Sequence, residues 1–275
     1  MAGDTSVGNN LIQAHRDLMP AFGLKTPAQA ALVGGGGKTS LMFALAAEAA
    51  AAGYRVITTT TTRILVPEAG QSSCVILGTE TEDLASQISA AWQRTRHVTV
   101  AREIAADNKL LGLAPETLDR LAALNLADLI INEADGAACR PVKAPNLTEP
   151  VIPGGTDMVI AVMGVDALGA ILDRANTFRP ELISAVTGLE MGGIITAEHI
   201  ARLVTHPQGI IQHSPGAAVI VPFINKIDLA DYRTGLYLAD AILARSHPQI
   251  KRVVFGALQD MRQPFISVQS KGDSA

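Results

Sequence analysis

Four consecutive glycines lead directly into a lysine and two hydroxyl residues near the start of the chain. The run reads Gly34, Gly35, Gly36, Gly37, Lys38, Thr39 and Ser40, and it follows the apolar residues 30–33. Because glycine lacks a Cβ, successive backbone N–H groups can turn towards one anion. Lys38 adds a positive charge, and the Thr39 hydroxyl can bind Mg²⁺. The sequence therefore predicts a phosphate-binding loop for a nucleoside triphosphate, with Lys38 as a catalytic residue.

The surroundings of this loop support the prediction and define its type. Residues 40–52 are almost all Ala, Leu and Met, which predicts a helix whose N-terminal dipole faces the phosphate. The common pattern G-x-x-x-x-G-K-[ST] has glycine where this chain has Leu32, so the loop is the shorter G-x-x-G-K-T of Mur-type peptide ligases. The dinucleotide pattern G-x-G-x-x-G fails, because Thr39 occupies the position of its third glycine.

Two carboxylates follow a second apolar segment. Residues 129–132 run into Glu133-Ala134-Asp135-Gly136, and the alternation of a strand puts both acids on one side. An apolar strand that ends in an acid is typical of the site that binds Mg²⁺ in P-loop proteins. We therefore expect Thr39, Glu133 and Asp135 at the metal. Glu133 and Asp135 are also candidate catalytic residues, since one of them could polarise the attacking water or hydroxyl.

Five threonines, residues 58–62, end a third apolar segment and precede Arg63. Threonine is a good strand residue, which accounts for the first two. We expect the hydroxyls of Thr60 and Thr61 near Mg²⁺ or the terminal phosphate, and Arg63 could neutralise phosphate charge.

A late apolar segment, residues 219–223, is followed by Asn225-Lys226-Ile227-Asp228. GTPases place this Asn-Lys-x-Asp order under the guanine base, where the aspartate accepts from the ring N–H and the exocyclic amine. Residues 255–258 resemble the base-backing loop of those proteins. Asn225, Lys226 and Asp228 therefore predict a preference for GTP over ATP. The alternative is that Asp228 caps a helix.

Composition bounds the remaining possibilities. The chain has 275 residues, a formal net charge of −4 and 48% hydrophobic residues, enough for a packed core and without the basic bias of a nucleic-acid-binding protein. No apolar run is long enough to span a bilayer and no signal-peptide core is found, so we expect a cytoplasmic protein without a membrane partner. The two cysteines, Cys74 and Cys139, lack the spacing of a disulfide framework or a zinc site.

Short apolar runs alternate with helical patterns, which predicts an α/β fold with three layers: a mostly parallel central sheet with helices on both faces. Ligands then bind at the carboxyl ends of the strands, where the residues above lie. We expect an N-terminal extension with a helix (1–27), a P-loop NTPase-like domain with loop insertions (28–262) and a loose tail (263–275). Residues 140–156 read as one long loop. The predicted strands are residues 30–33, 54–58, 74–77, 97–101, 129–132, 158–163, 218–223 and 252–255, and the further helices are residues 82–94, 115–124, 180–187, 197–204 and 231–245.

The combination of motifs resembles one family. Several motifs carry this resemblance. They include the glycine loop, the threonine run, Lys109-Leu110-Leu111-Gly112, Glu133 to Gly136, Arg140-Pro141-Val142-Lys143, Glu149-Pro150, Arg179-Pro180-Glu181 and Asn225 to Asp228. Together they resemble the YqeC-type selenium-dependent hydroxylase accessory proteins over most of residues 28–230. The chain departs from that pattern at two positions. The family tends to have histidine where this chain has Phe178, and histidine or lysine where it has Arg63.

The resemblance implies a P-loop NTPase-like protein that helps to mature molybdenum hydroxylases or their pterin cofactor. A molybdenum hydroxylase or its maturation proteins are then the expected partners. At the level of fold, the chain is also similar to dethiobiotin synthetase and nickel-chaperone GTPases, which often work as dimers.

Two classes of function remain open. In the first, the protein is a switch or chaperone NTPase whose loops reorder when the nucleotide is hydrolysed. In the second, it is an ATP-dependent kinase or ligase, and the loop of residues 140–156, with Arg140 and Lys143, binds an anionic substrate.

Overall fold

The computed structural model describes residues 5–7 and 10–271, and its centre is an eleven-stranded sheet of order β1-β2-β16-β15-β14-β12-β3-β10-β4-β7-β6. The strands from β15 to β6 are all parallel, and β16, β2 and β1 extend that edge in antiparallel pairs. The strands are β1 (Thr5–Val7), β2 (Asn10–His15), β3 (Ala28–Gly34), β4 (Val56–Thr60), β6 (Val75–Leu77), β7 (His97–Ala101), β10 (Leu129–Glu133), β12 (Met158–Gly164), β14 (Val219–Asn225), β15 (Arg252–Phe255) and β16 (Phe265–Ser270).

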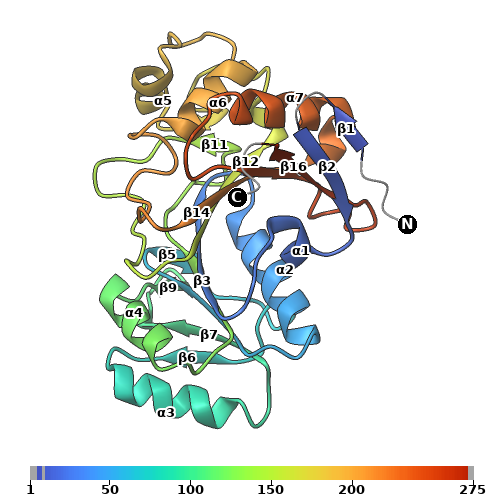
Figure 1. Cartoon of the computed structure of the whole chain (residues 1–275). Helices are drawn as coiled ribbons and strands as arrows, with labels where there is room; N and C mark the ends of the chain where they lie inside the picture. The colour runs from blue at the N-terminus through green and yellow to red at the C-terminus, as the bar shows by residue number, and fades with distance from the viewer. Residues whose placement is uncertain (1–4, 8–9, 272–275) are drawn as a thin grey trace.

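Helices cover both faces of this sheet (Figure 1), which confirms the predicted three-layer α/β fold. On one face, α1 and α2 pack against residues such as Leu32 and Ile160. On the other face, α6 and α7 pack on one half of the sheet, while α3 and α4 pack on the other half. The helices are α1 (Leu18–Phe22), α2 (Lys38–Ala51), α3 (Thr81–Ala91), α4 (Pro115–Ala123), α5 (Pro180–Thr187), α6 (Ala197–Thr205) and α7 (Tyr232–Leu243), with 3₁₀ turns η1 (Val165–Ala167) and η2 (Ile227–Leu229).

Two small sheets lie beside the central one. One contains β5 (Arg63–Leu65), β9 (Lys109–Leu111) and β8 (Glu103–Ile104), and the other pairs β11 (Val142–Lys143) with β13 (Thr177–Phe178). All eight predicted strands and the six predicted helices are present, with ends that differ by a few residues. No helix of the described residues is long and apolar enough to cross a membrane.

The two chain ends correct the expected domain limits. Residues 263–275 were expected to form a loose tail, but β16 inserts between β15 and β2 and buries Phe265 and Val268. Likewise, β2 and α1 belong to the main body and are not an extension from it: Leu18 and Phe22 are buried in the core beside α2. Residues 1–4, 8–9 and 272–275 lie outside the described part. β2 and β16 are held in the sheet because they pair with each other, which satisfies their backbone hydrogen bonds and buries their apolar side chains.

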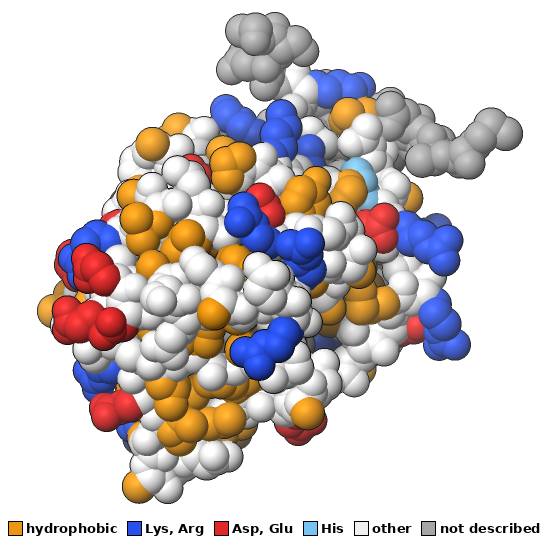
Figure 2. Space-filling model, turned by 90° about the horizontal axis from the view of Figure 1, so that it is seen from below, with side chains coloured by type: hydrophobic (Ala, Val, Ile, Leu, Met, Phe, Trp, Pro, Cys, Tyr) orange, Lys and Arg blue, Asp and Glu red, His pale blue; other side chains and the backbone are white. Residues whose placement is uncertain are grey.

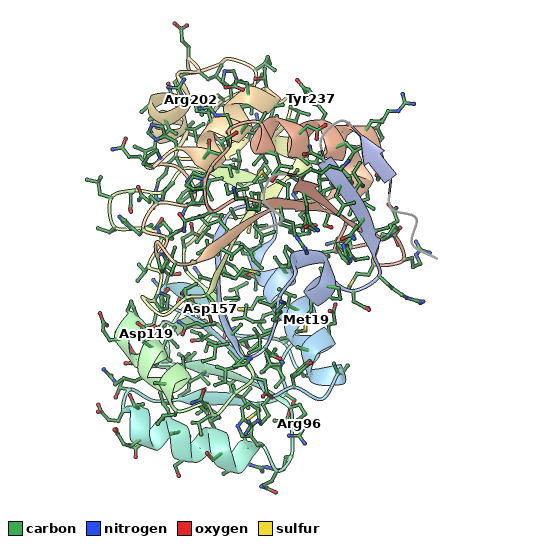
Figure 3. The ribbon with its side chains drawn as sticks, viewed as in Figure 1. Met19, Arg96, Asp119, Asp157, Arg202 and Tyr237 are labelled. Carbon is green, nitrogen blue, oxygen red and sulfur yellow. The ribbon has the colours of Figure 1, made fainter. Side chains whose placement is uncertain are left out.

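Charged side chains are spread over the face seen in Figure 2, with Lys and Arg interspersed among Asp and Glu and with hydrophobic groups between them. The outer helices α6 and α7 carry Arg202 and Tyr237 on the far side of the sheet from Met19 of α1 (Figure 3).

His97, at the start of β7, predicts a specific dependence of stability on pH. Its Nε2 lies 2.9 Å from Thr58 Oγ1, and burial lowers the pKa of His97 from 6.5 to about 4. Between these two values the unfolded chain binds a proton that the folded chain does not, so the free energy of unfolding falls as pH falls. From pH 7 to 4, we expect His97 to account for a loss of about 3 kcal/mol.

Urea unfolding at several pH values measures this effect. In His97→Gln, which retains polar atoms near Thr58, the acid-side loss of stability is expected to shrink by that amount. An unchanged slope in the variant would show that other groups cause the acid sensitivity.

Candidate functional site

The glycine loop connects β3 to the N-terminus of α2, at the carboxyl edge of the sheet where the flanking strands β10 and β12 run to either side. Gly36 and Gly37 have φ angles of +73° and +121°, in the left-handed region that other residues rarely adopt. A Cβ on Gly36 would lie 2.2 Å from Gly164 N, and one on Gly37 would lie 2.6 Å from Asn225 Nδ2. Both positions therefore require glycine.

The amides of this loop divide into two groups. Gly34 N donates to Asp135 Oδ2 at 3.1 Å, Gly35 N to Val162 O at 2.9 Å and Gly36 N to Arg140 O at 2.9 Å. The next four amides, of residues 37–40, have no hydrogen-bond partner within the part of the chain that the structure describes. They are the free N–H groups at the start of a 14-residue helix, where the helix dipole also favours an anion.

Lys38 is buried against two carboxylates. Its Nζ donates to Gly34 O at 2.7 Å and lies 3.2 Å from Asp135 Oδ1 and 3.7 Å from Glu133 Oε1. Burial alone would lower the pKa of Lys38, but the two carboxylates outweigh it and the pKa is raised. Lys38 therefore carries its positive charge at the base of the loop.

Thr39 and Glu133 bring two oxygens together beside the free amides. Thr39 Oγ1 donates to Glu133 Oε2 at 2.7 Å. Burial raises the pKa of Glu133, although the charge of Lys38 and the Thr39 hydrogen bond oppose the shift. A hydroxyl and a carboxylate are hard donors of the kind that Mg²⁺ binds, and Mg²⁺ completes its six-fold shell with waters and phosphate oxygens. The pair therefore fits a Mg²⁺ site shared with a bound phosphate.

Asp135 lies elsewhere than expected. β10 ends at Glu133, and the chain then turns so that the Asp135 carboxylate is enclosed between Lys38 and Lys143, with Lys143 Nζ 3.0 Å from Oδ2. It is 1% exposed and does not line the cavity above the loop. Of the two acids expected at the metal, only Glu133 therefore lines the cavity, because the Asp135 carboxylate contacts two lysines and a loop amide.

Lys143 extends a series of ion pairs that runs from Glu133 through Lys38, Asp135, Lys143 and Glu149 to Arg179, which we call the buried chain of charges. Its side chain is fully buried, and Nζ donates to Gly136 O at 2.7 Å and to Glu149 Oε2 at 2.8 Å. Arg179 Nη1 lies 2.6 Å from the same Glu149 oxygen, and these cations hold the pKa of Glu149 low against the opposing effect of its burial. Lys143, which would bind an anionic substrate in the kinase or ligase alternative, is therefore a structural cation out of reach of solvent.

A cavity of about 650 Å³ opens above the loop. Among the described residues that line it, five are cationic and one, Glu133, is acidic. The Arg140 guanidinium has no ion-pair partner among the described side chains, and the exposed Cys139 thiol also faces this cavity, whereas Cys74 does not. The complete lining is Gly35, Gly36, Gly37, Lys38, Thr39, Ser40, Arg63, Ile64, Leu65, Lys109, Glu133, Gly136, Ala137, Ala138, Cys139, Arg140 and Lys226.

Thr60 and Thr61 hold the backbone beside the site. Thr60 Oγ1 donates to Glu133 O at 2.7 Å, and Thr61 Oγ1 donates to Val151 O at 2.6 Å. Neither residue lines the cavity. We expected these hydroxyls near Mg²⁺ or the phosphate. The Thr60 hydroxyl instead holds the end of β10, from which Glu133 projects, and the Thr61 hydroxyl holds the long loop at Val151.

The long loop of residues 140–156 is anchored and not merely solvated. On the side of the sheet covered by α4, Asp119 accepts hydrogen bonds from Gly154 N at 3.1 Å and Gly155 N at 3.0 Å. Asp157, just after the loop, accepts from Gln29 N at 2.8 Å. Figure 3 shows Asp119 and Asp157 in the same region of the molecule.

The Asn225 to Asp228 run lies at another side of the loop. Asn225 Nδ2 donates to Gly36 O at 2.8 Å, and Asn225 Oδ1 accepts from Leu258 N at 3.2 Å, so Asn225 ties the glycine loop to the segment after β15. Lys226 lines the cavity and pairs with Asp166 at 2.8 Å. Asp228 is exposed in η2 and does not line this cavity.

Sequence reasoning from the residues missed several members of the site. Lys109, Ile64 and Leu65 reach the cavity from the small sheet, and Glu149 and Arg179 complete the buried chain. Lys109, Glu149 and Arg179 lie in runs that carry the family resemblance, but the residue types there do not indicate a role. Their place in the site depends on the pairing of β5 with β9 and of β11 with β13.

Comparison with known proteins gives a consistent assignment. The model of a family described as "YqeC protein" matches residues 30–181, a range that holds the glycine loop, both carboxylates and the buried chain of charges. A curated protein of Escherichia coli (strain K12), named "Uncharacterized protein YqeC", is 38% identical over 122 residues. That match covers 44% of this chain and 48% of the relative, so the chain spans about half the length of the curated relative it matches.

Proposed function

The chain belongs to the YqeC family, and on that premise we propose that it binds a nucleoside triphosphate with Mg²⁺ and hydrolyses it. One observation supports the proposal: Lys38, the Thr39–Glu133 pair and four amides without a partner among the described residues converge on one cavity, whose lining there has five cationic side chains and one acidic side chain. A triphosphate matches this arrangement in charge and in its demand for many hydrogen-bond donors.

The residues then have distinct roles. The amides of residues 37–40 and Lys38 hold the phosphate chain, while Thr39 and Glu133 hold Mg²⁺. When bound, Mg²⁺ neutralises negative charge on the phosphate oxygens. Glu133, buried and with a raised pKa, is also suited to accept a hydrogen bond from the attacking water.

GTP is favoured over ATP in this proposal. Asn225 connects the glycine loop to the segment after β15, and Asp228 lies one short turn further along the chain in an exposed position. An exposed carboxylate there is free to accept from the ring N–H and the amine of guanine.

The cellular role in the proposal rests on the family resemblance. The protein acts in the cytoplasm in the maturation of selenium-dependent molybdenum hydroxylases or of their pterin cofactor, with such a hydroxylase or its maturation proteins as partner. A homodimer is proposed only from the likeness in fold to dethiobiotin synthetase and the nickel-chaperone GTPases.

One observation favours a second candidate, an ATP-dependent kinase or ligase. The cavity extends past Glu133 to Arg63 and Lys109, which leaves room for an anionic substrate beside the nucleotide. Nucleotide hydrolysis that is stimulated by a small molecule supports the kinase or ligase. Hydrolysis that is stimulated by a protein partner supports a switch or chaperone NTPase.

The first test is replacement of Glu133 by glutamine. This change retains an acceptor for Thr39 but removes the charge, and we expect Mg²⁺-dependent release of phosphate from GTP to fall roughly 10²-fold. Lys38→Ala is a poorer choice, because it also leaves Glu133 buried without a cation and Asp135 with only Lys143.

The matched control is Glu181→Gln, which removes an exposed carboxylate that pairs with Arg174 away from the cavity. Phosphate release should be unchanged in this control. Equal activity in the parent and Glu133→Gln would remove Glu133 from the reaction. Failure of the parent to bind either GTP or ATP with Mg²⁺ in calorimetry would overturn the proposed function.

A further inference from the structure

The small sheet of β5, β9 and β8 forms one wall of the cavity. β5 and β9 are antiparallel, with Ile64 opposite Leu110 and Leu65 opposite Lys109. Ile64 and Leu110 are buried in the core that contains α2. Because side chains alternate across a strand, Arg63, Leu65 and Lys109 share the opposite face, and all three line the cavity.

The position of this wall relative to Glu133 is fixed by the backbone. Gly112 N donates to Thr62 O at 2.8 Å and Leu113 N donates to Thr60 O at 2.9 Å, so the chain that leaves β9 is bonded to the segment that leaves β4. Thr60 in turn bonds to Glu133 O. Arg63 and Lys109 are therefore held on the Glu133 side of the glycine loop, whereas Asn225 and Lys226 lie on another side of it.

Arg63 and Lys109 are held together by one acid. Asp107 lies 2.8 Å from Arg63 Nη2 and 3.4 Å from Lys109 Nζ, and the three side chains are about half exposed. Ion pairs at such exposure stabilise a fold by only about 0–1 kcal/mol. Two cations against one acid leave a net positive charge, and the Arg140 guanidinium adds to the same cavity.

Leu65 adds an exposed apolar surface to the same cavity wall as these cations. Its side chain is 63% exposed although it lies in the cavity wall. A large aliphatic side chain left open beside charged groups favours a ligand that has both an acidic group and an apolar body.

We propose that Arg63, Lys109 and Leu65 form a second subsite, which binds the acidic group and the apolar body of a small organic acid or phosphate ester beside the terminal phosphate of the nucleotide. This assignment rests on the proposed function. Arg63 and Lys109 take the acidic group as charge-assisted donors, and Leu65 covers the apolar body. The subsite gives the protein a place for a substrate or an effector that the nucleotide itself does not occupy.

The test uses phenyl phosphate, benzoate and inorganic phosphate as probes. The full-length protein is first saturated with Mg²⁺ and β,γ-imido-GTP, and each probe is then titrated by calorimetry. We expect phenyl phosphate or benzoate to bind, and Arg63→Gln and Lys109→Gln each to weaken that binding about tenfold, the effect of losing one charge-assisted hydrogen bond. Leu65→Ala should weaken the aromatic probes and leave inorganic phosphate unchanged.

Arg102→Gln is the matched control. Arg102 precedes β8, pairs with Glu103 at 3.2 Å and does not line the cavity. Arg102→Gln changes the net charge of the protein by the same amount as Arg63→Gln or Lys109→Gln. Probe affinity should be unchanged in this variant. No binding to the parent, or binding that is equally strong in Arg63→Gln and Lys109→Gln, would overturn the subsite.

The design separates this inference from the proposed function. If β,γ-imido-GTP fails to bind the parent, the proposed function fails, and the same probes titrated into nucleotide-free protein still report on Arg63 and Lys109. If Arg63→Gln weakens the nucleotide as much as the probes, the two cations belong to the nucleotide site, and a separate subsite is excluded.

Discussion

Lys143→Met is expected to lower the free energy of unfolding by about 3–5 kcal/mol, the usual effect of removing one partner from a buried ion pair. The side chain of Lys143 is fully buried, and its Nζ lies 3.0 Å from Asp135 and 2.8 Å from Glu149. Methionine fills nearly the same volume, so the loss reflects the uncompensated carboxylates and not a cavity. Equilibrium unfolding in urea measures the difference.

Lys109→Met provides the control for this prediction. It removes a lysine of a half-exposed ion pair, for which a loss of about 1 kcal/mol or less is expected. In an Asp135→Asn background, Lys143→Met should destabilise less than in the parent, because one of the stranded charges is already absent. If Lys143→Met and Lys109→Met lower the free energy of unfolding equally, the buried ion pairs of Lys143 are not stronger than an exposed pair, and the prediction is wrong.

Asp228→Asn is expected to change base preference, by roughly 10³-fold in the ratio of GTP to XTP affinity. In the proposed complex with GTP, the Asp228 carboxylate accepts two hydrogen bonds from guanine, whereas adenine would present an acceptor to it. Asparagine replaces one acceptor by a donor, which suits xanthine, whose ring has a carbonyl where guanine has an amine. Competition titrations of GTP, ATP and XTP against both proteins give the ratio.

Asp231→Asn is the neighbouring control. The Asp231 carboxylate is occupied as the cap of α7, where it accepts from Thr234 N at 2.7 Å, and asparagine caps a helix nearly as well. The base preference of this variant should equal that of the parent. ATP binding as strong as GTP binding in the parent, with no gain for XTP in Asp228→Asn, would show that the Asn-Lys-Ile-Asp run is accidental.

The parallel core of the sheet was predictable because its signals are local. Segments such as residues 97–101 and 252–255 are short, apolar and bounded by polar residues, and both form strands with those limits. β2 and β16 were missed because their strands depend on each other: Ile12 pairs with Val268, and neither segment is a persuasive strand without its partner.

The glycine loop, the helix after it and the acid at the end of β10 were determined by the sequence alone, since glycine spacing, helix propensity and strand alternation act within a few residues. Tertiary structure decided which of those groups meet. The alternation of a strand places Glu133 and Asp135 together, yet only Glu133 reaches Thr39, because β10 ends there and the buried Lys143 holds Asp135. Lys109 joins the cavity through the pairing of β9 with β5. Such contacts depend on the packing of segments that are distant in the sequence. The free energy that selects them comes from burying charges and apolar groups together, and a short stretch of sequence does not show which groups will be buried together.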